Sequence, residues 1–155
     1  MNILTLLPVD IDTILGFLLW RHHGDLMAAT TALGLHREPE SRSGKVNIRS
    51  EVRRRIYSTV FSIDKTLASF TGRPPFLSHR YASCPMPLDL DDETFFLPEE
   101  ERLKVIAKLK PNGWNAEGRI TSTTYIRVNM CLAMIRDEIL EISLGSWNEC
   151  LPNCI

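Results

Sequence analysis

The sequence has few residues from which to build a metal cluster or a disulfide scaffold. Its four cysteines, Cys84, Cys131, Cys150 and Cys154, include no CxxC pair. Structural zinc sites need four ligands, and secreted disulfide scaffolds are short and rich in cysteine. We therefore expect free thiols in a reducing compartment, in preference to a zinc site at Cys150 and Cys154.

Long apolar runs are also lacking. The longest N-terminal run, residues 14–20, is far shorter than the ~20 residues that a membrane-spanning helix requires. Pro8, Asp10 and Asp12 interrupt the segment where a signal peptide would be apolar, and no basic residue precedes Arg21. We expect a buried helix here, with neither an export signal nor a membrane span.

Surplus charge and the common catalytic motifs are missing as well. The chain has 18 basic and 19 acidic residues, so it is not a polybasic nucleic-acid binder. HExxH, GxSxG, the P-loop and GxGxxG are all absent. The acidic cluster at residues 89–93 lacks the central glycine and the final glutamate of a calcium-binding loop, so we expect a solvated loop. We expect no enzymatic activity.

What the sequence does contain is helical patterning. It predicts an all-α fold, an irregular helical bundle of four or five helices with a long Pro-rich loop at 76–98. Capping residues, glycines and prolines set the expected boundaries. The predicted helices cover residues 8–20, 25–35, 47–70, 98–110 and 122–144.

Three of these helices carry an apolar stripe at helical spacing, which predicts the face that each turns to the core. The stripes comprise Leu26, Ala29 and Leu33; Val52, Ile56, Val60, Ile63, Leu67 and Phe70; and Tyr125, Val128, Leu132, Ile135, Ile139 and Ile142. Charge is also uneven, because residues 37–80 are basic and residues 85–101 are acidic. We expect the acidic loop to fold back onto the basic helix.

Four short motifs occur in order between residues 28 and 92. They are ALGLHRE from Ala32, EVRRRIY from Glu51 followed by Asp64, GRPP from Gly72, and PMPLDLDDE from Pro85. In this order they resemble the fungal-specific transcription factor domain, the xylanolytic-activator-type regulatory region of fungal Zn2Cys6 proteins. The residues that match the family motifs are Gly34, Leu35, His36, Arg37, Glu51, Arg53, Arg54, Arg55, Asp64, Gly72, Arg73 and Pro74.

The resemblance implies a regulatory domain, or a fragment of one, in a nuclear protein that regulates transcription. In such proteins, DNA and zinc are bound by an N-terminal six-cysteine cluster, and we expect that cluster to be missing from this chain. We therefore expect no cofactor here, no catalytic residue and no metal ligand. The implied organisation is one partial domain over 1–155, with the motifs in 28–92 and a helical part at 98–145. Expected partners are a co-regulator protein, a small-molecule effector or a second copy.

The motif residues also have a physical interpretation. Arg53 and Asp64 are eleven positions apart and share nearly one azimuth of a helix. An arginine placed there can lay its stem on the core and reach a carboxylate or a helix carbonyl. Arg73, just past the helix, is placed to reach Asp64 or the last carbonyls. These residues therefore favour a role in holding the fold.

Two alternatives from other classes stay open. A stand-alone helical protein could bind a small molecule near Trp20, Trp114 or Trp147, although the core is the more common place for tryptophan. A co-regulator or dimerisation module without DNA binding is the second alternative. Ligand-dependent fluorescence and gel filtration, respectively, test them.

Overall fold

The computed structural model describes residues 11–38 and 47–145. This part of the chain is all-α, as predicted, with no strand among the described residues. It contains α1 (Ile11–Ala32), α2 (Ile48–Thr71), α3 (Glu99–Ala107) and α4 (Ser122–Leu144). The Pro-rich loop holds only two short 3-10 helices, η1 (His79–Tyr81) and η2 (Asp92–Phe96). None of the described helices is long and apolar enough to cross a membrane.

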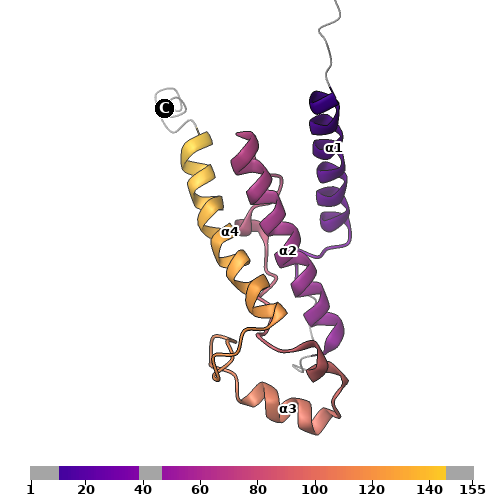
Figure 1. The fold of residues 1–155 in the computed structure, drawn as a ribbon, viewed down its shortest axis with the longest axis vertical. Coiled ribbons are helices and arrows are strands. Elements are labelled where there is room, and N and C mark those ends of the chain that lie inside the picture. Colours follow the sequence, from indigo (N-terminus) through magenta and orange to yellow (C-terminus); the bar gives the residue numbers. More distant parts are fainter. Residues whose placement is uncertain (1–10, 39–46, 146–155) are drawn as a thin grey trace, which may run out of the picture.

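Three long helices lie side by side, with α2 in the middle (Figure 1). α1 runs antiparallel to α2, because His23 contacts Asp64 while Gly34 contacts Arg53. α4 runs parallel to α2, because Phe61 packs with Met130, and further along both helices Lys65 pairs with Asp137. Parallel neighbours need a long connection, and the loop and α3 between residues 72 and 121 provide it.

The two helices predicted at 8–20 and 25–35 are one continuous helix, so that prediction of a break was wrong. Gly24 lies inside α1, where glycine costs stability but does not end a helix. A Cβ on Gly24 would lie 3.7 Å from the Phe76 ring, which is an ordinary van der Waals contact, so the packing there does not require a glycine. The chain turns only at Gly34, whose φ of 63° is left-handed.

The two ends of α2 lie where the sequence predicts them. The side chain of Asn47 caps the first turn, where its Oδ1 accepts a hydrogen bond from the Ser50 amide at 2.8 Å. Gly72 ends the helix in the left-handed region, with φ of 62°. α3 also begins at Pro98 as predicted, with three glutamates in its first turn.

These glycines support a matched prediction. Gly72→Ala should lower the free energy of unfolding by about 1 kcal/mol or more, because alanine is strained at a positive φ. Gly16→Ala should raise it by up to about 1 kcal/mol, because Gly16 is helical and a Cβ there meets nothing within 4 Å. Urea unfolding of both variants checks this, and equal midpoints would contradict it.

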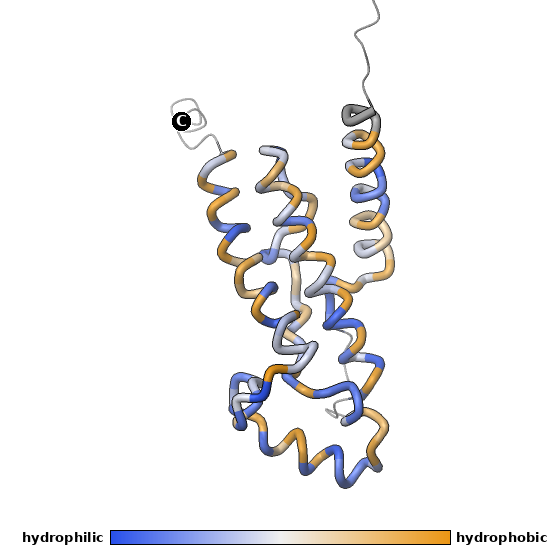
Figure 2. The backbone as a smooth tube through the Cα atoms, viewed as in Figure 1, coloured by the Kyte–Doolittle hydropathy of each residue, from blue (hydrophilic) through white to orange (hydrophobic). Residues whose placement is uncertain are grey.

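The apolar stripes do not form the core, which overturns the prediction for all three helices. Leu26 and Leu33 are exposed, as are Val52, Ile56, Ile63 and Phe70 on α2. Of the α2 stripe, only Val60 is buried, and Leu67 is half-buried. All six stripe residues of α4 are exposed, with exposed fractions from 44% to 71%. Figure 2 shows the apolar residues recurring along these helices in orange.

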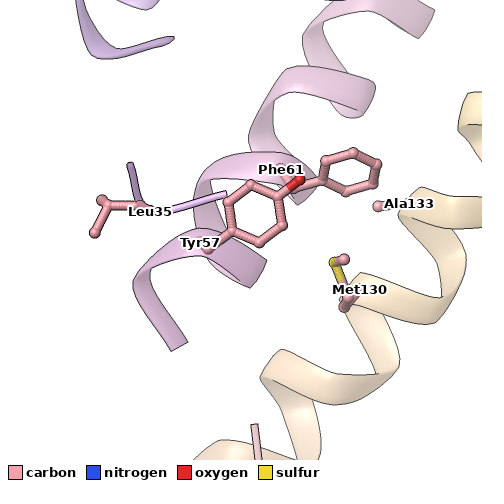
Figure 3. Packing of buried hydrophobic residues seen from close by; sticks show 5 residues of the cluster. All are labelled: Leu35, Tyr57, Phe61, Met130 and Ala133. Atoms are coloured by element: carbon pink, nitrogen blue, oxygen red, sulfur yellow. The ribbon is translucent and has the colours of Figure 1, made fainter. Parts of the chain in front are cut away.

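The opposite, more polar faces are the ones that pack together. The small apolar core is formed by Leu35, Tyr57, Phe61, Met130 and Ala133, as Figure 3 shows. Around it lie buried charged residues, and these occupy much of the space that a conventional core would give to leucine and isoleucine. They are Glu51, Asp64, Lys65, Asp89, Arg127 and Asp137.

Candidate functional site

The centre of the molecule is an ion network that joins α2 to α4. The Nζ of Lys65 lies 3.0 Å from Oδ2 of Asp64 and 2.9 Å from Oδ1 of Asp137, and it also donates to the Leu77 carbonyl. The Lys65 and Asp64 side chains are fully buried, and that of Asp137 is 1% exposed. Buried charges persist only when they are paired and hydrogen-bonded, and here both conditions hold.

Asp64 extends this network to α1 and to the loop after α2. Its Oδ1 lies 3.0 Å from Nε2 of His23 and accepts the Phe76 amide, while its Oδ2 accepts the Leu77 amide at 2.9 Å. A single carboxylate therefore ties α1, α2 and the start of the Pro-rich loop to one point. These three contacts, together with the Lys65 ammonium, account for the burial of an aspartate in the middle of a helix.

Asp137 links α4 to the Pro-rich loop in the same way. Its Oδ2 accepts hydrogen bonds from the backbone amide and from Nδ1 of His79, at 3.1 and 2.7 Å. The other ring nitrogen of His79 lies 3.2 Å from Glu138 at the surface. Burial alone would raise the pKa of Asp137, but hydrogen bonds from Lys65 and His79 outweigh it and hold that pKa below its ordinary value.

The second buried carboxylate of α2 itself lies near the other end of that helix. Glu51 is fully buried, and its Oε1 accepts the Leu88 amide at 2.6 Å. Its Oε2 lies 3.6 Å from Arg54, and Arg55 is 3.9 Å from Oε1. Desolvation raises the pKa of Glu51 despite the Leu88 amide and the nearby arginines.

The three consecutive arginines of α2 point in different directions, as residues 100° apart on a helix must. Arg53 donates to the Gly34 carbonyl at 2.9 Å, so it reaches a carbonyl of the turn after α1 and not the carboxylate or helix carbonyl that the sequence predicted. Arg54 forms a bidentate pair with Glu38, at 2.6 and 3.3 Å. Together these two arginines hold the turn after α1 against the N-terminal half of α2.

Arg55 reaches the acidic loop, which folds back onto the basic helix as predicted. It pairs with Asp92, donates to the Leu90 carbonyl at 2.9 Å and lies over the ring of Phe95. The expectation of a solvated acidic cluster is wrong for Asp89, which is 2% exposed. Within the same cluster, Asp91 pairs with Arg119 at 2.9 Å, and Glu93 is exposed.

Asp89 is buried because a ring of donors satisfies it. Thr124, Thr121 and the side chain and amide of Asn115 all donate to its carboxylate, and Thr121 and Thr124 also form the capping box of α4. Desolvation would raise the pKa of Asp89, but these hydrogen bonds lower it overall. Asp89 thus connects the loop to the first turn of α4.

The remaining motif residues lie at the junctions between elements. Leu35 packs into the core, and the His36 carbonyl accepts the amides of Ser83 and Cys84. Arg37, Gly72, Arg73 and Pro74 are exposed. Arg73 does not reach Asp64, whose oxygens are taken by backbone amides; its guanidinium lies 4.6 Å from the Trp20 ring centre instead.

Sequence reasoning missed four buried polar residues that belong to these networks: His23, Lys65, Arg127 and Asp137. Arg127 is 2% exposed, donates to the carbonyls of Pro87 and Asn112, and lies over the Trp114 ring. Burial lowers the pKa of Arg127. The only sequence pattern that could have indicated these residues was the polar stripe opposite each apolar stripe, and such a stripe usually indicates a solvated face.

The described residues contain no group of three or more metal-ligating side chains. Cys84 and Cys131 are free thiols, as expected, and burial raises the pKa of Cys84 to about 11. The predictions for Cys150, Cys154 and Trp147 fall outside the described residues. Trp20 and Trp114 are half-buried and stack on arginines, as described above.

A groove of about 470 Å³ lies over the outer face of α2, between α1 and the start of α4. Apolar walls come from Leu19, Ile63, Leu67, Tyr125 and Ile126. The hydroxyls on its floor are already used, because Thr59, Ser62 and Thr66 each donate to the carbonyl four residues earlier. The groove therefore offers an apolar surface with few free donors.

The carboxylates predict how stability depends on pH. The pKa values of Asp89 and Asp137 are lower in the folded state than in the unfolded state, where the pKa of aspartate is about 3.9. Each carboxylate therefore stabilises the fold above about pH 3.9, and this stabilisation is lost as the pH falls through the folded-state pKa. Stability should therefore fall steeply below about pH 5. Asp137→Asn should flatten this slope in urea titrations, whereas Asp25→Asn on exposed α1 should not; identical slopes would contradict this.

The comparisons with known proteins agree with the motifs. The family model described as "Fungal specific transcription factor domain" matches residues 9–142. Pyrimidine pathway regulatory protein 1 of Saccharomyces cerevisiae is 32% identical over 82 residues, which cover 53% of this chain and 9% of that protein. The Fusarisetin A cluster transcription factor fsa6 of a Fusarium species is 29% identical over 77 residues, covering 50% and 10%.

The chain thus spans only about a tenth of the length of these curated relatives. No solved structure matches it. The family model, however, covers most of the sequence and includes every motif residue, from Gly34 to Pro74, that holds α2 to its surroundings or marks its ends. The chain therefore belongs to the fungal-specific transcription factor domain family.

Proposed function

We propose that this chain is a regulatory part of a fungal zinc-cluster transcription factor, and that it acts in the nucleus on DNA-templated transcription. The observation that carries the proposal is the family match over residues 9–142, whose motif residues hold α2 in place. The names of both relatives describe regulators, one of a pathway and one of a gene cluster. An enzyme is not proposed.

DNA and zinc binding, in this proposal, belong to a six-cysteine cluster encoded outside the printed sequence. The four cysteines present are too few and too widely spaced to form it. The chain would then act by receiving a signal, from a small-molecule effector or a co-regulator protein, and by changing the activity of the linked DNA-binding segment.

The first test is the sequence of the transcript upstream of the codon for Met1. An in-frame run of six cysteines with zinc-cluster spacing would support the proposal directly. A transcript that truly starts at Met1 would count against DNA binding through this polypeptide, and would favour a regulator that works through a partner. Fusion of the chain to an unrelated DNA-binding domain, with a reporter gene as readout, then tests regulation itself.

A second candidate function is the binding of an apolar small molecule, and the groove over α2 is the observation that favours it. A volume of about 470 Å³ lies within the range of small-molecule sites. Leu19 and Tyr125 line the groove, so titration calorimetry with a panel of apolar metabolites tests occupancy directly. A panel that gives no binding heat would remove this candidate.

A further inference from the structure

Arg127 is a buried cation that has no acidic partner in the described part of the chain. It is 2% exposed, and none of the described carboxylates lies within 4.0 Å of its guanidinium. Lys65, by contrast, has two such partners, Asp64 and Asp137. Two nitrogens of Arg127 donate to backbone carbonyls, but its buried Nε has no hydrogen-bond partner among the described residues. A buried charge is costly unless an opposite charge compensates it, so this guanidinium is suited to an anion.

The acidic residues around Arg127 do not supply that compensation. Asp89 and Glu51 act on Arg127 from beyond 4.0 Å. Asp89 is already held by the ring of donors at the start of α4, and Glu51 by the Leu88 amide and Arg54. Burial outweighs the attraction of both carboxylates and holds the pKa of Arg127 below its ordinary value. Much of the positive charge therefore remains uncompensated.

Arg127 lines an open pocket of about 430 Å³, where the Pro-rich loop meets the end of α3. We call this the Arg127 pocket. Two further cations, Arg54 and Lys110, line it, and none of its described lining residues is acidic. Arg54 is paired with Glu38, whereas Lys110 forms no ion pair with any residue that the structure describes. The apolar part of the wall comprises Pro85, Met86, Leu88, Ile106, Leu109 and Pro111.

Gly113, another lining residue, leaves one side of the guanidinium uncovered. Its φ of 79° is left-handed, and a Cβ on it would lie 3.2 Å from Nη1 of Arg127 and 3.3 Å from the Leu88 side chain. Any other residue would therefore fill the space beside the guanidinium. Gly113 belongs to a tight turn in which its amide donates to the Lys110 carbonyl and the Lys110 amide donates to the Trp114 carbonyl, both at 2.8 Å. The turn thus places Lys110 and the open side of Arg127 on the same pocket.

We propose that the Arg127 pocket binds a small organic carboxylate. The carboxylate group pairs with Arg127 and Lys110, and an apolar body packs against the aliphatic wall. A volume of about 430 Å³ lies within the range of small-molecule sites. The pocket is separate from the groove over α2, whose described lining contains no charged residue. The inference rests on the proposed function only for its consequence in transcription, because binding itself does not depend on that function.

Titration of the ¹⁵N-labelled full chain, followed by amide chemical shifts, tests the pocket. The probes are benzoate, phenylacetate and 1-naphthoate, each compared with its uncharged amide, which has nearly the same shape. We expect saturable shifts at the amides of Leu88, Gly113 and Trp114 with at least one of the carboxylates. Its affinity should exceed that of the matching amide about tenfold or more, because only the acid forms charge-assisted hydrogen bonds.

Two lysine variants locate the bound charge. Lys110→Glu should weaken carboxylate binding about fivefold or more, because it replaces an attractive charge with a repulsive one. Lys104→Glu is the matched control, since it makes the same charge change on α3 but outside the pocket, and it should bind as the unaltered chain does. Both lysines are exposed, so the helical circular dichroism should not change. Arg127→Met should abolish carboxylate binding; if that variant does not fold, the comparison of the two lysine variants decides.

Three outcomes would overturn the proposal: no saturable shift with any of the three carboxylates, equal affinity for acid and amide, or equal binding by the Lys110 and Lys104 variants. The reporter assay keeps this result distinct from the proposed function. A carboxylate that binds without changing reporter output would retain the pocket and remove only its regulatory role. A pocket that binds none of the probes would leave the transcript and reporter results as they stand.

Discussion

Asp64→Ala should destabilise the fold by about 3–5 kcal/mol, as expected when one partner of a buried ion pair is removed. The substitution removes the acceptor of four groups at once: the ring of His23, the ammonium of Lys65, and two loop amides. Each buried donor that loses its partner contributes roughly 1–3 kcal/mol. No new contact in an alanine side chain can replace them.

Thermal unfolding followed by circular dichroism measures this effect. A loss of this size should lower the midpoint of a chain this long by about 10 °C or more. The control is Asp25→Ala on the exposed side of α1, where a change within about 0.5 kcal/mol is expected. If Asp64→Ala unfolds at the same temperature as the unaltered chain, the carboxylate does not hold these elements together.

Lys65→Met should have an effect of similar size, about 3–5 kcal/mol, for the opposite electrostatic reason. Methionine fills the space of the lysine stem, but it leaves two buried carboxylates, Asp64 and Asp137, without their shared cation. The like charges then face one another in a medium of low polarity. The pKa of Asp137 should rise, because Lys65 is the largest of the influences that lower it.

Two readouts separate this mechanism from a loss of packing. The stability deficit of Lys65→Met should shrink as pH falls from 7 towards 4, because protonation removes the buried charge. Adding Asp137→Asn to Lys65→Met should restore part of the stability, so the double variant should lose less than the sum of the two single variants. Lys104→Met on the exposed face of α3 is the control. A deficit that is independent of pH, with additive single effects, would refute the electrostatic account.

The local features of this fold could be predicted from the sequence because local chemistry determines them. Asn47 and Gly72 mark the ends of α2, Pro98 precedes α3, and the prolines of the long loop exclude a strand. The family motifs identified the residues that hold the turn after α1 to α2. Arg53, Arg54 and Glu51 contact segments that lie from 16 to 37 residues away.

The packing prediction was wrong because an apolar stripe shows only that one face of a helix is hydrophobic. It does not state which neighbour covers it. In α2, Ile56 and Ile63 have the pattern of a core face, yet Asp64 and Lys65 are the residues that are buried. The polar face packs because its charged side chains form ion pairs and hydrogen bonds with other elements. The partner can be far away in the sequence, as Asp137 is from Lys65. No pattern within a single helix reveals such a pairing.

The parallel arrangement of α2 and α4 has a consequence for the order in which the chain assembles. His23 and Asp64 are 41 residues apart, so α1 and α2 can pair as soon as both have left the ribosome. Arg136 meets Thr66 across 70 residues, and Lys65 obtains its second carboxylate only when α4 has been synthesised. Closing so long a loop is slow relative to local contacts. The growing polypeptide therefore passes through a stage in which the Lys65 face of α2 is not yet covered by α4, and chaperones would bind the chain at this stage.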